Sequence, residues 1–136
     1  MKRKVEIINT SKLKEAIPEL KNSDIEVYLD AENEKSKKQI IQILHEAGRK
    51  KVNTILGCIL RGAYNNSIYK KESKGVAAIK ISGGKSKNQN IRIYCKEFYN
   101  NGKKVVMVTP IIKKVQENRK SEKILNIVST IEKLKY

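Results

Sequence analysis

Two segments decide the predicted fold: Val76-Ala77-Ala78-Ile79-Lys80-Ile81-Ser82 and Ile91-Arg92-Ile93-Tyr94-Cys95-Lys96-Glu97-Phe98. Apolar and polar side chains alternate along both segments, which is typical of β-strands with one buried face. The polar residues Gly83–Asn90 predict a hairpin connection between them. After the turn signal Asn100-Asn101-Gly102, Val105–Ile112 is almost continuously apolar, as in a central strand buried on both faces. The sequence therefore predicts a three-stranded antiparallel meander, whose last residues leave the ladder at Pro110.

Helical patterns flank this meander. Glu34–Ala47 and Lys50–Arg61 carry apolar residues at helical spacing, and Gly48 ends the first of these helices. Ser121–Leu134 predicts a closing amphipathic helix with Ser121 as its N-cap. We therefore expect an α+β fold in which N-terminal helices pack on a small antiparallel sheet and a C-terminal helix closes the structure.

The N-terminal residues are less regular. Lys4–Ile8 predicts a short strand, Ser11–Leu20 predicts a helical turn or two, and Asp24–Leu29 is ambiguous between helix and strand. A length of 136 residues fits one domain. We therefore assign residues 1–136 to a single domain and residues 1–22 to an N-terminal extension or extra strand.

Positive charge is the strongest compositional signal. The chain has 30 Lys and Arg against 14 Asp and Glu, a formal net charge of +16. Residues 1–33 hold six basic and seven acidic side chains, so the excess lies in residues 34–136. Such an excess favours a polyanionic partner, because each neutralised phosphate releases condensed counterions. The alternative is a lysine-rich surface that serves solubility.

Composition excludes several classes of protein. The two cysteines, Cys58 and Cys95, are too few for a disulfide scaffold and indicate reduced thiols in a cytoplasm. No apolar stretch approaches the roughly 20 residues that span a bilayer, and the basic N-terminus precedes no apolar signal-peptide core. We expect a cytoplasmic protein that makes no membrane contact.

Nucleotide-binding motifs are absent. Gly83-Gly84-Lys85-Ser86 imitates a phosphate-binding loop, but it lies between strands and does not open a helix. His45 is the sole histidine and reads as an exposed helix residue, while Cys58 and Cys95 read as small core residues. The sequence offers no ligand cluster for a metal, and it implies no cofactor.

Cations gather on one face of the predicted hairpin. Lys80, Arg92 and Lys96 project from the face opposite the core, with Tyr94 among them. Lys113 and Lys114 leave the next strand nearby, and Lys85 and Lys87 lie in the hairpin connection. Cations with an interleaved tyrosine suit phosphate binding beside a stacked base, so these residues are predicted to bind RNA. A solvated polar face of a half-exposed sheet is the alternative.

The stretch from Val76 to Leu134 resembles the RelE/HigB group of bacterial type II toxin–antitoxin toxins, within the RelE/ParE superfamily. The resemblance rests on the strand through Lys80, the polar hairpin, Ile91-Arg92-Ile93-Tyr94, the buried strand into Lys113-Lys114, and the C-terminal helix. It implies helices on a small antiparallel sheet with an RNA site on its basic side. It also implies metal-independent endonucleolytic cleavage of mRNA on the ribosome, by attack of a 2′-hydroxyl on the adjacent phosphate.

The resemblance also assigns roles to residues. Arg92 corresponds to the arginine that holds the scissile phosphate, Lys80 to a strand lysine, and Lys114 to a second basic residue of the site. No tyrosine stands early in the last helix, so the proton donor is not identified. The resemblance implies a cognate antitoxin as protein partner. Two alternatives stay open, a ParE-like inhibitor of DNA gyrase and a nucleic-acid-binding module without catalysis.

Overall fold

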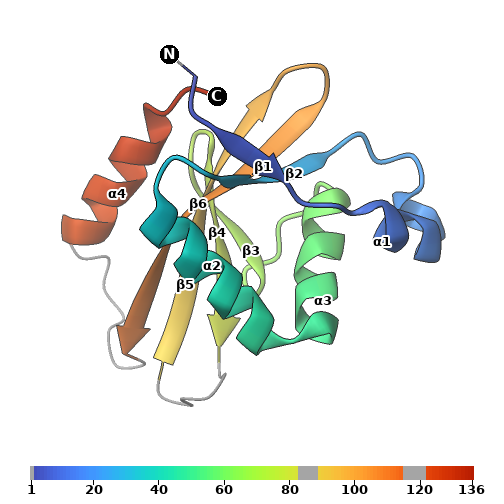
Figure 1. The fold of residues 1–136 in the computed structure, drawn as a ribbon, viewed down its shortest axis with the longest axis horizontal. Helices are drawn as coiled ribbons and strands as arrows, with labels where there is room; N and C mark the ends of the chain where they lie inside the picture. The colour runs from blue at the N-terminus through green and yellow to red at the C-terminus, as the bar shows by residue number, and fades with distance from the viewer. Residues whose placement is uncertain (1, 83–88, 115–121) are drawn as a thin grey trace.

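The structure is a computed structural model that describes residues 2–82, 89–114 and 122–136. In chain order its elements are β1 (Val5–Ile7), α1 (Ser11–Ala16), the 3-10 helix η1 (Pro18–Leu20), β2 (Glu26–Asp30), α2 (Glu34–Ala47), α3 (Arg49–Leu60), β3 (Tyr69–Ser73), β4 (Val76–Ser82), β5 (Gln89–Tyr99), β6 (Lys103–Lys114) and α4 (Glu122–Glu132). Figure 1 shows the sheet with these helices around it, and the two termini close together. Within the described ranges, no helix is long and apolar enough to cross a membrane.

The sheet is larger than the sequence predicts, and it is mixed. Its six strands run in the order β1-β2-β6-β5-β4-β3. β2 pairs with β6 in parallel, whereas the other neighbouring strands pair antiparallel. The predicted fold class, N-terminal helices on a small antiparallel sheet as in RelE/HigB toxins, is therefore wrong. The N-terminal residues supply β1, an edge strand of this sheet, within the short strand predicted over Lys4–Ile8.

Two strands account for most of this difference. β2 is only five residues long, and so short a segment does not distinguish a helix from a strand by its pattern. It forms because it covers part of the edge of the apolar strand β6. β3 is largely polar because it is an edge strand with one neighbour, where charged side chains hinder pairing with other chains.

The strands β4, β5 and β6 form an antiparallel meander, as the alternating segments predict. Contrary to expectation, β6 does not leave the ladder at Pro110: this residue pairs with Ile93, and the strand continues to Lys114. Pro110 fits because β2 pairs with β6 only as far as Met107. Beyond that point β6 has no neighbour on the β2 side among the described strands, so a missing N–H costs little there.

One core layer lies between the sheet and the helices α2 and α3. Alternate residues of the central strands, including Ala77, Ile79 and Ile93, meet Ile40 of α2 and Ile59 of α3 there. Each of these five side chains is at most 1% exposed. The two helices form because their apolar residues recur at helical spacing. α2 begins where the side chain of its N-cap Asn33 accepts a hydrogen bond from the Ser36 amide, and it ends before Gly48, whose φ is +90°.

A second core layer lies on the opposite face of the sheet, under α4. Ile124, Val128 and Ile131 of α4 pack with Ala78 and Tyr94, the strand residues that point away from the first layer. The alternating polar residues of these strands predict that this face is exposed. The structure corrects that assignment, because α4 covers the centre of the face and only part of it remains accessible.

Candidate nucleic-acid interface

Lys80 and Arg92 lie directly opposite each other on β4 and β5. The register pairs them two residues beyond the pair formed by Ala78 and Tyr94. Since successive side chains of a strand point to opposite faces, all four residues lie on the face that α4 covers. Ala78 and Tyr94 are fully buried, whereas Lys80 and Arg92 are only partly buried. The two cations therefore lie where the buried layer under α4 gives way to solvent.

Two residues of the neighbouring edge strand, Lys70 and Glu72, complete the group. Lys70 is the register partner of Ala78 and lies close enough to Lys80 to repel its charge. Glu72 Oε1 lies 3.9 Å from Arg92 Nη1, and the Glu72 side chain is 1% exposed against 24% for Arg92. We call Lys70, Glu72, Lys80 and Arg92 the basic cluster. Its three cations surround one carboxylate, so an excess of positive charge remains.

The surroundings of Lys80 disfavour its charged form. Partial burial lowers the pKa of Lys80 from its ordinary value, repulsion from Arg92 and Lys70 lowers it further, and attraction to Glu72 opposes these effects. Half-buried cations that repel one another gain most from an added anion, such as a phosphate. The nearly inaccessible carboxylate of Glu72 does not reach a ligand at the surface. Its attraction to Arg92 and Lys80 opposes the repulsion between these two cations.

The structure does not bring the other predicted residues of this face into the open cluster. The ring of Tyr94 is 0% exposed and packs in the core layer under α4. Lys96 Nζ donates a hydrogen bond of 2.6 Å to the main-chain oxygen of Glu132, near the C-terminal end of α4. Tyr94 therefore stabilises the fold in this conformation and does not offer a face to a base, and Lys96 anchors α4.

Two further predicted residues lie at the end of β6. Lys113 and Lys114 occupy the last positions of β6, where the register places them opposite Asn90 and Gln89. Lys113 is thus two positions from Ile111, the register partner of Arg92. Lys85 and Lys87 lie outside the described residues, as does Ser121, the predicted N-cap of the last helix.

Sequence reasoning missed Lys70 and Glu72. Their strand, Tyr69-Lys70-Lys71-Glu72-Ser73, contains one apolar residue and therefore reads as a loop. A usable signal is the following Lys74-Gly75, because Gly75 has a φ of +74° in the turn that connects β3 to β4. A glycine turn directly before an alternating strand indicates that the preceding residues return along it as a hairpin.

Other chemistry-bearing residues lie away from the cluster. Cys58 and Cys95 are buried, as predicted, and burial raises the pKa of both thiols, so they stay protonated and unreactive. His45 is an exposed residue near the C-terminal end of α2. In the described part of the chain, no three or more His, Cys, Asp or Glu side chains form a group suited to a metal ion.

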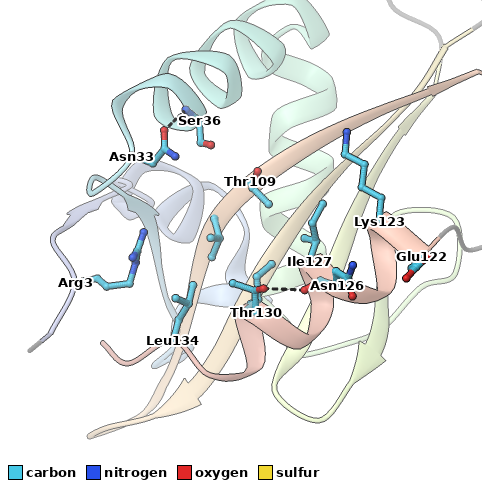
Figure 2. A pocket seen from close by; sticks show the side chains of 12 residues that line it. Arg3, Asn33, Ser36, Thr109, Glu122, Lys123, Asn126, Ile127, Thr130 and Leu134 are labelled. Atoms are coloured by element: carbon cyan, nitrogen blue, oxygen red, sulfur yellow. Dashed lines mark hydrogen bonds between the residues drawn. The ribbon is translucent and has the colours of Figure 1, made fainter.

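A cavity of about 600 Å³ lies between α4, β6 and the N-terminal end of α2 (Figure 2). Apolar side chains form much of its wall, among them Ile127 and Ile131 of α4 and Leu134, which follows that helix. Two of its polar groups already have partners: Asn33 accepts from the Ser36 amide, and Arg3 forms an ion pair of 2.7 Å with Asp30. Neither Lys80 nor Arg92 lines it. The cavity is therefore separate from the basic cluster and shows no convergent catalytic groups.

Comparisons of the chain with protein-family models, curated proteins and solved structures find no significant match. A function for this protein must therefore be argued from the chemistry of its own residues.

Proposed function

We propose that this protein binds RNA at the basic cluster and cleaves it there, as a toxin-like endoribonuclease that acts on mRNA at the ribosome in the cytoplasm. The observation that supports this proposal most is the direct pairing of Lys80 with Arg92, whose Nη1 lies 3.9 Å from the buried carboxylate of Glu72. The fold does not support this proposal, because the six-stranded mixed sheet differs from the small antiparallel sheet expected of RelE/HigB toxins. The support comes from the charge of the cluster and from its partial exposure.

The proposed reaction uses the RNA's own 2′-hydroxyl. The 2′-oxygen bonds to the adjacent phosphorus, the bond to the 5′-oxygen breaks, and the products are a 2′,3′-cyclic phosphate and a 5′-hydroxyl. The guanidinium of Arg92 can hold two phosphate oxygens and stabilise the additional negative charge of the transition state. The proton of the 2′-hydroxyl passes to water, and the leaving 5′-oxygen takes a proton from Lys80. A lysine with a lowered pKa releases its proton more readily, which suits this role.

Glu72 acts as a positioning residue in this mechanism. Its side chain is 1% exposed, so a substrate phosphate approaches Arg92 rather than the carboxylate. Attraction to Glu72 keeps Arg92 and Lys80 together despite their mutual repulsion. A second candidate function, RNA binding without cleavage, is favoured by one observation. Apart from the buried Glu72, the described cluster contains only cations, and cations alone are sufficient to bind phosphate.

We also propose an acidic antitoxin as the protein partner. The net charge of +16 makes free copies of the chain repel one another and attract nucleic acid, and an acidic protein would neutralise that charge. Co-expression of the gene next to this one tests the proposal. Restored growth is the expected result, whereas unchanged growth arrest contradicts it.

An in vitro cleavage assay tests the function directly. Purified protein is incubated with mRNA, with and without ribosomes, in the presence of EDTA, and the RNA ends are mapped by primer extension. Cleavage to cyclic phosphate ends is expected, and it should be lost in Arg92→Ala but kept in Lys50→Ala, an exposed lysine on α3. Retarded but intact RNA indicates the binding module. Intact, unbound RNA together with inhibited gyrase supercoiling indicates a ParE-like inhibitor.

A further inference from the structure

Two exposed tyrosines lie on the side of the sheet that carries the first core layer, opposite to the basic cluster. Tyr64, in the connection between α3 and β3, is 43% exposed, and Tyr99, at the end of β5, is 79% exposed. Lys103, the register partner of Tyr99, reaches over the Tyr64 ring and thus links the two tyrosines. Lys71 and Lys103 place their ammonium groups 5.9 Å and 5.2 Å from the centroid of the Tyr64 ring. We call Tyr64, Tyr99, Lys71 and Lys103 the tyrosine platform.

The strand residues of the platform share one face of the sheet. Lys71 is the register partner of Ala77, which points into the core under α2 and α3. Tyr99 and Lys103 are register partners at the start of the β5–β6 hairpin, two positions beyond the pair of Glu97 and the core residue Val105. The alternation of side chains therefore places Lys71, Tyr99 and Lys103 on the α2 and α3 face. Lys80 and Arg92 lie on the opposite face.

The ring of Tyr64 is held in a fixed orientation. It stacks on the buried ring of Tyr69, with the centroids 5.7 Å apart and the planes inclined by 14°. Its hydroxyl donates a hydrogen bond of 2.6 Å to Glu97, a carboxylate that is 8% exposed. Burial and the hydrogen bond to Glu97 raise the pKa of Tyr64, so the hydroxyl stays a donor. With Tyr69 stacked on it and two ammonium groups near its centroid, the Tyr64 ring forms a fixed edge of the platform.

Stabilisation of the buried Glu97 carboxylate does not account for all four residues of the tyrosine platform. Glu97 already accepts a hydrogen bond of 2.5 Å from Tyr69 and has Lys103 at 3.2 Å as counter-ion. Neither the exposed ring of Tyr99 nor the cation of Lys71 adds a hydrogen bond or an ion pair to that network among the described contacts. Exposed aromatic rings interleaved with lysines are the arrangement with which proteins bind single-stranded nucleic acid, because rings stack on bases and cations meet phosphates.

We propose that the tyrosine platform is a second RNA-binding site, which stacks a base of a single-stranded segment on the exposed ring of Tyr99, next to Tyr64, while Lys71 contacts a flanking phosphate. This inference rests on the proposed RNA binding, but it does not require cleavage. The platform lies on the other face of the sheet, so it takes a different segment of the RNA from the one at Arg92. Its role is to hold the substrate, not to react with it.

Equilibrium binding of fluorescently labelled single-stranded RNA tests the platform. The measurement uses the full chain carrying Arg92→Ala, which removes the main phosphate contact proposed at the basic cluster. On this background Tyr99→Ala should weaken binding about fivefold or more, the usual effect of one lost base–aromatic stack. Tyr99→Phe keeps the ring and should bind as the parent does. Because Tyr99 is 79% exposed, neither change threatens the fold.

A second RNA, with the same backbone but without bases, separates stacking from phosphate contact. The Arg92→Ala parent and its Tyr99→Ala variant should bind this abasic RNA equally, because no ring can stack on it. Equal affinity of Tyr99→Ala and its parent for the normal RNA would overturn the platform, as would an equal loss for the abasic RNA. Failure of the proposed function looks different, since the wild-type protein would then leave mRNA intact, or Arg92→Ala would cleave it as fast as the wild type, whatever the binding data show.

Discussion

Arg92 Nη1 and Glu72 Oε1 lie 3.9 Å apart, and the carboxylate is almost wholly buried while the guanidinium reaches solvent. This difference in exposure separates the proposed roles of the two residues. The carboxylate of Glu72 is shielded from solvent and attracts the nearby cations, whereas the guanidinium of Arg92 is accessible to a phosphate. Lys80, directly opposite Arg92 on the neighbouring strand, joins the same electrostatic group.

Arg92→Ala should reduce RNA cleavage by about 100-fold or more, because it removes a preorganised donor from the developing negative charge. Arg92→Lys should retain part of the activity, since a lysine keeps the charge but not the two-pronged geometry. The domain should stay folded, because Lys70 and Lys80 remain near Glu72. Initial rates of mRNA cleavage and circular dichroism measure both effects, with Lys50→Ala as the matched control. Full activity of folded Arg92→Ala would remove this residue from the site.

Glu72→Gln should shift the pH dependence of RNA binding. Glu72 raises the pKa of Lys80 against burial and against repulsion from Arg92 and Lys70, so its neutralisation lowers that pKa further. Lys80 then loses its proton at a lower pH, and the alkaline fall in RNA affinity moves to lower pH. Binding isotherms between neutral and alkaline pH measure the shift. A uniform loss of affinity at every pH would instead indicate that Glu72 acts only through the stability of the fold.

The salt dependence of RNA binding should identify phosphate contacts. Lys80→Ala and Lys114→Ala should each reduce the slope of log affinity against log salt by about one charge, as expected for a lost phosphate contact. Lys50→Ala on the opposite layer should leave the slope unchanged. If Lys80→Ala cuts cleavage but not the slope, Lys80 contributes to proton transfer and does not bind a phosphate in the ground state.

Ile131→Ala should destabilise the domain by about 2–5 kcal/mol, because it opens a cavity between α4 and the sheet. Ile131 is 2% exposed, whereas Leu125 on the same helix is 54% exposed. Leu125→Ala should therefore cost less than about 0.5 kcal/mol, the usual limit for surface changes. Urea unfolding of both variants measures the difference. Equal and small losses would show that α4 contributes little to the second core layer.

Asp30→Asn should destabilise the domain at neutral pH but not in strong acid. Burial raises the pKa of Asp30, but hydrogen bonds from Arg3, Tyr136 and the Glu32 amide, with attraction to Arg3, lower it by more. A lowered pKa means that the ionised carboxylate adds stability above its ordinary value of 3.8, and that this stability is lost as the pH falls through the folded-state pKa. Unfolding at several pH values should show the two proteins converging in acid. A difference that stays constant with pH would contradict this assignment.

The sequence by itself determines the elements with strong periodicity. α2, α3 and the meander β4–β6 occur close to the predicted bounds, because each carries enough alternating or helically spaced apolar residues to bury one face. The charge excess and the core positions of Cys58 and Cys95 also follow from the sequence. It likewise places Lys80 opposite Arg92 once the hairpin is recognised, since local pairing fixes the register.

Only the tertiary structure decides which neighbours these elements acquire. The parallel pairing of β2 with β6 joins residues that are far apart in the chain, and no local pattern encodes such a contact. The packing of α4 over Tyr94 turns a predicted RNA-binding ring into a core residue. The edge strand β3 brings Lys70 and Glu72 to the basic cluster, and it brings Lys71 to Tyr64 on the other face. Patterns report how a segment buries its own surface, whereas a site depends on which segments the fold places side by side.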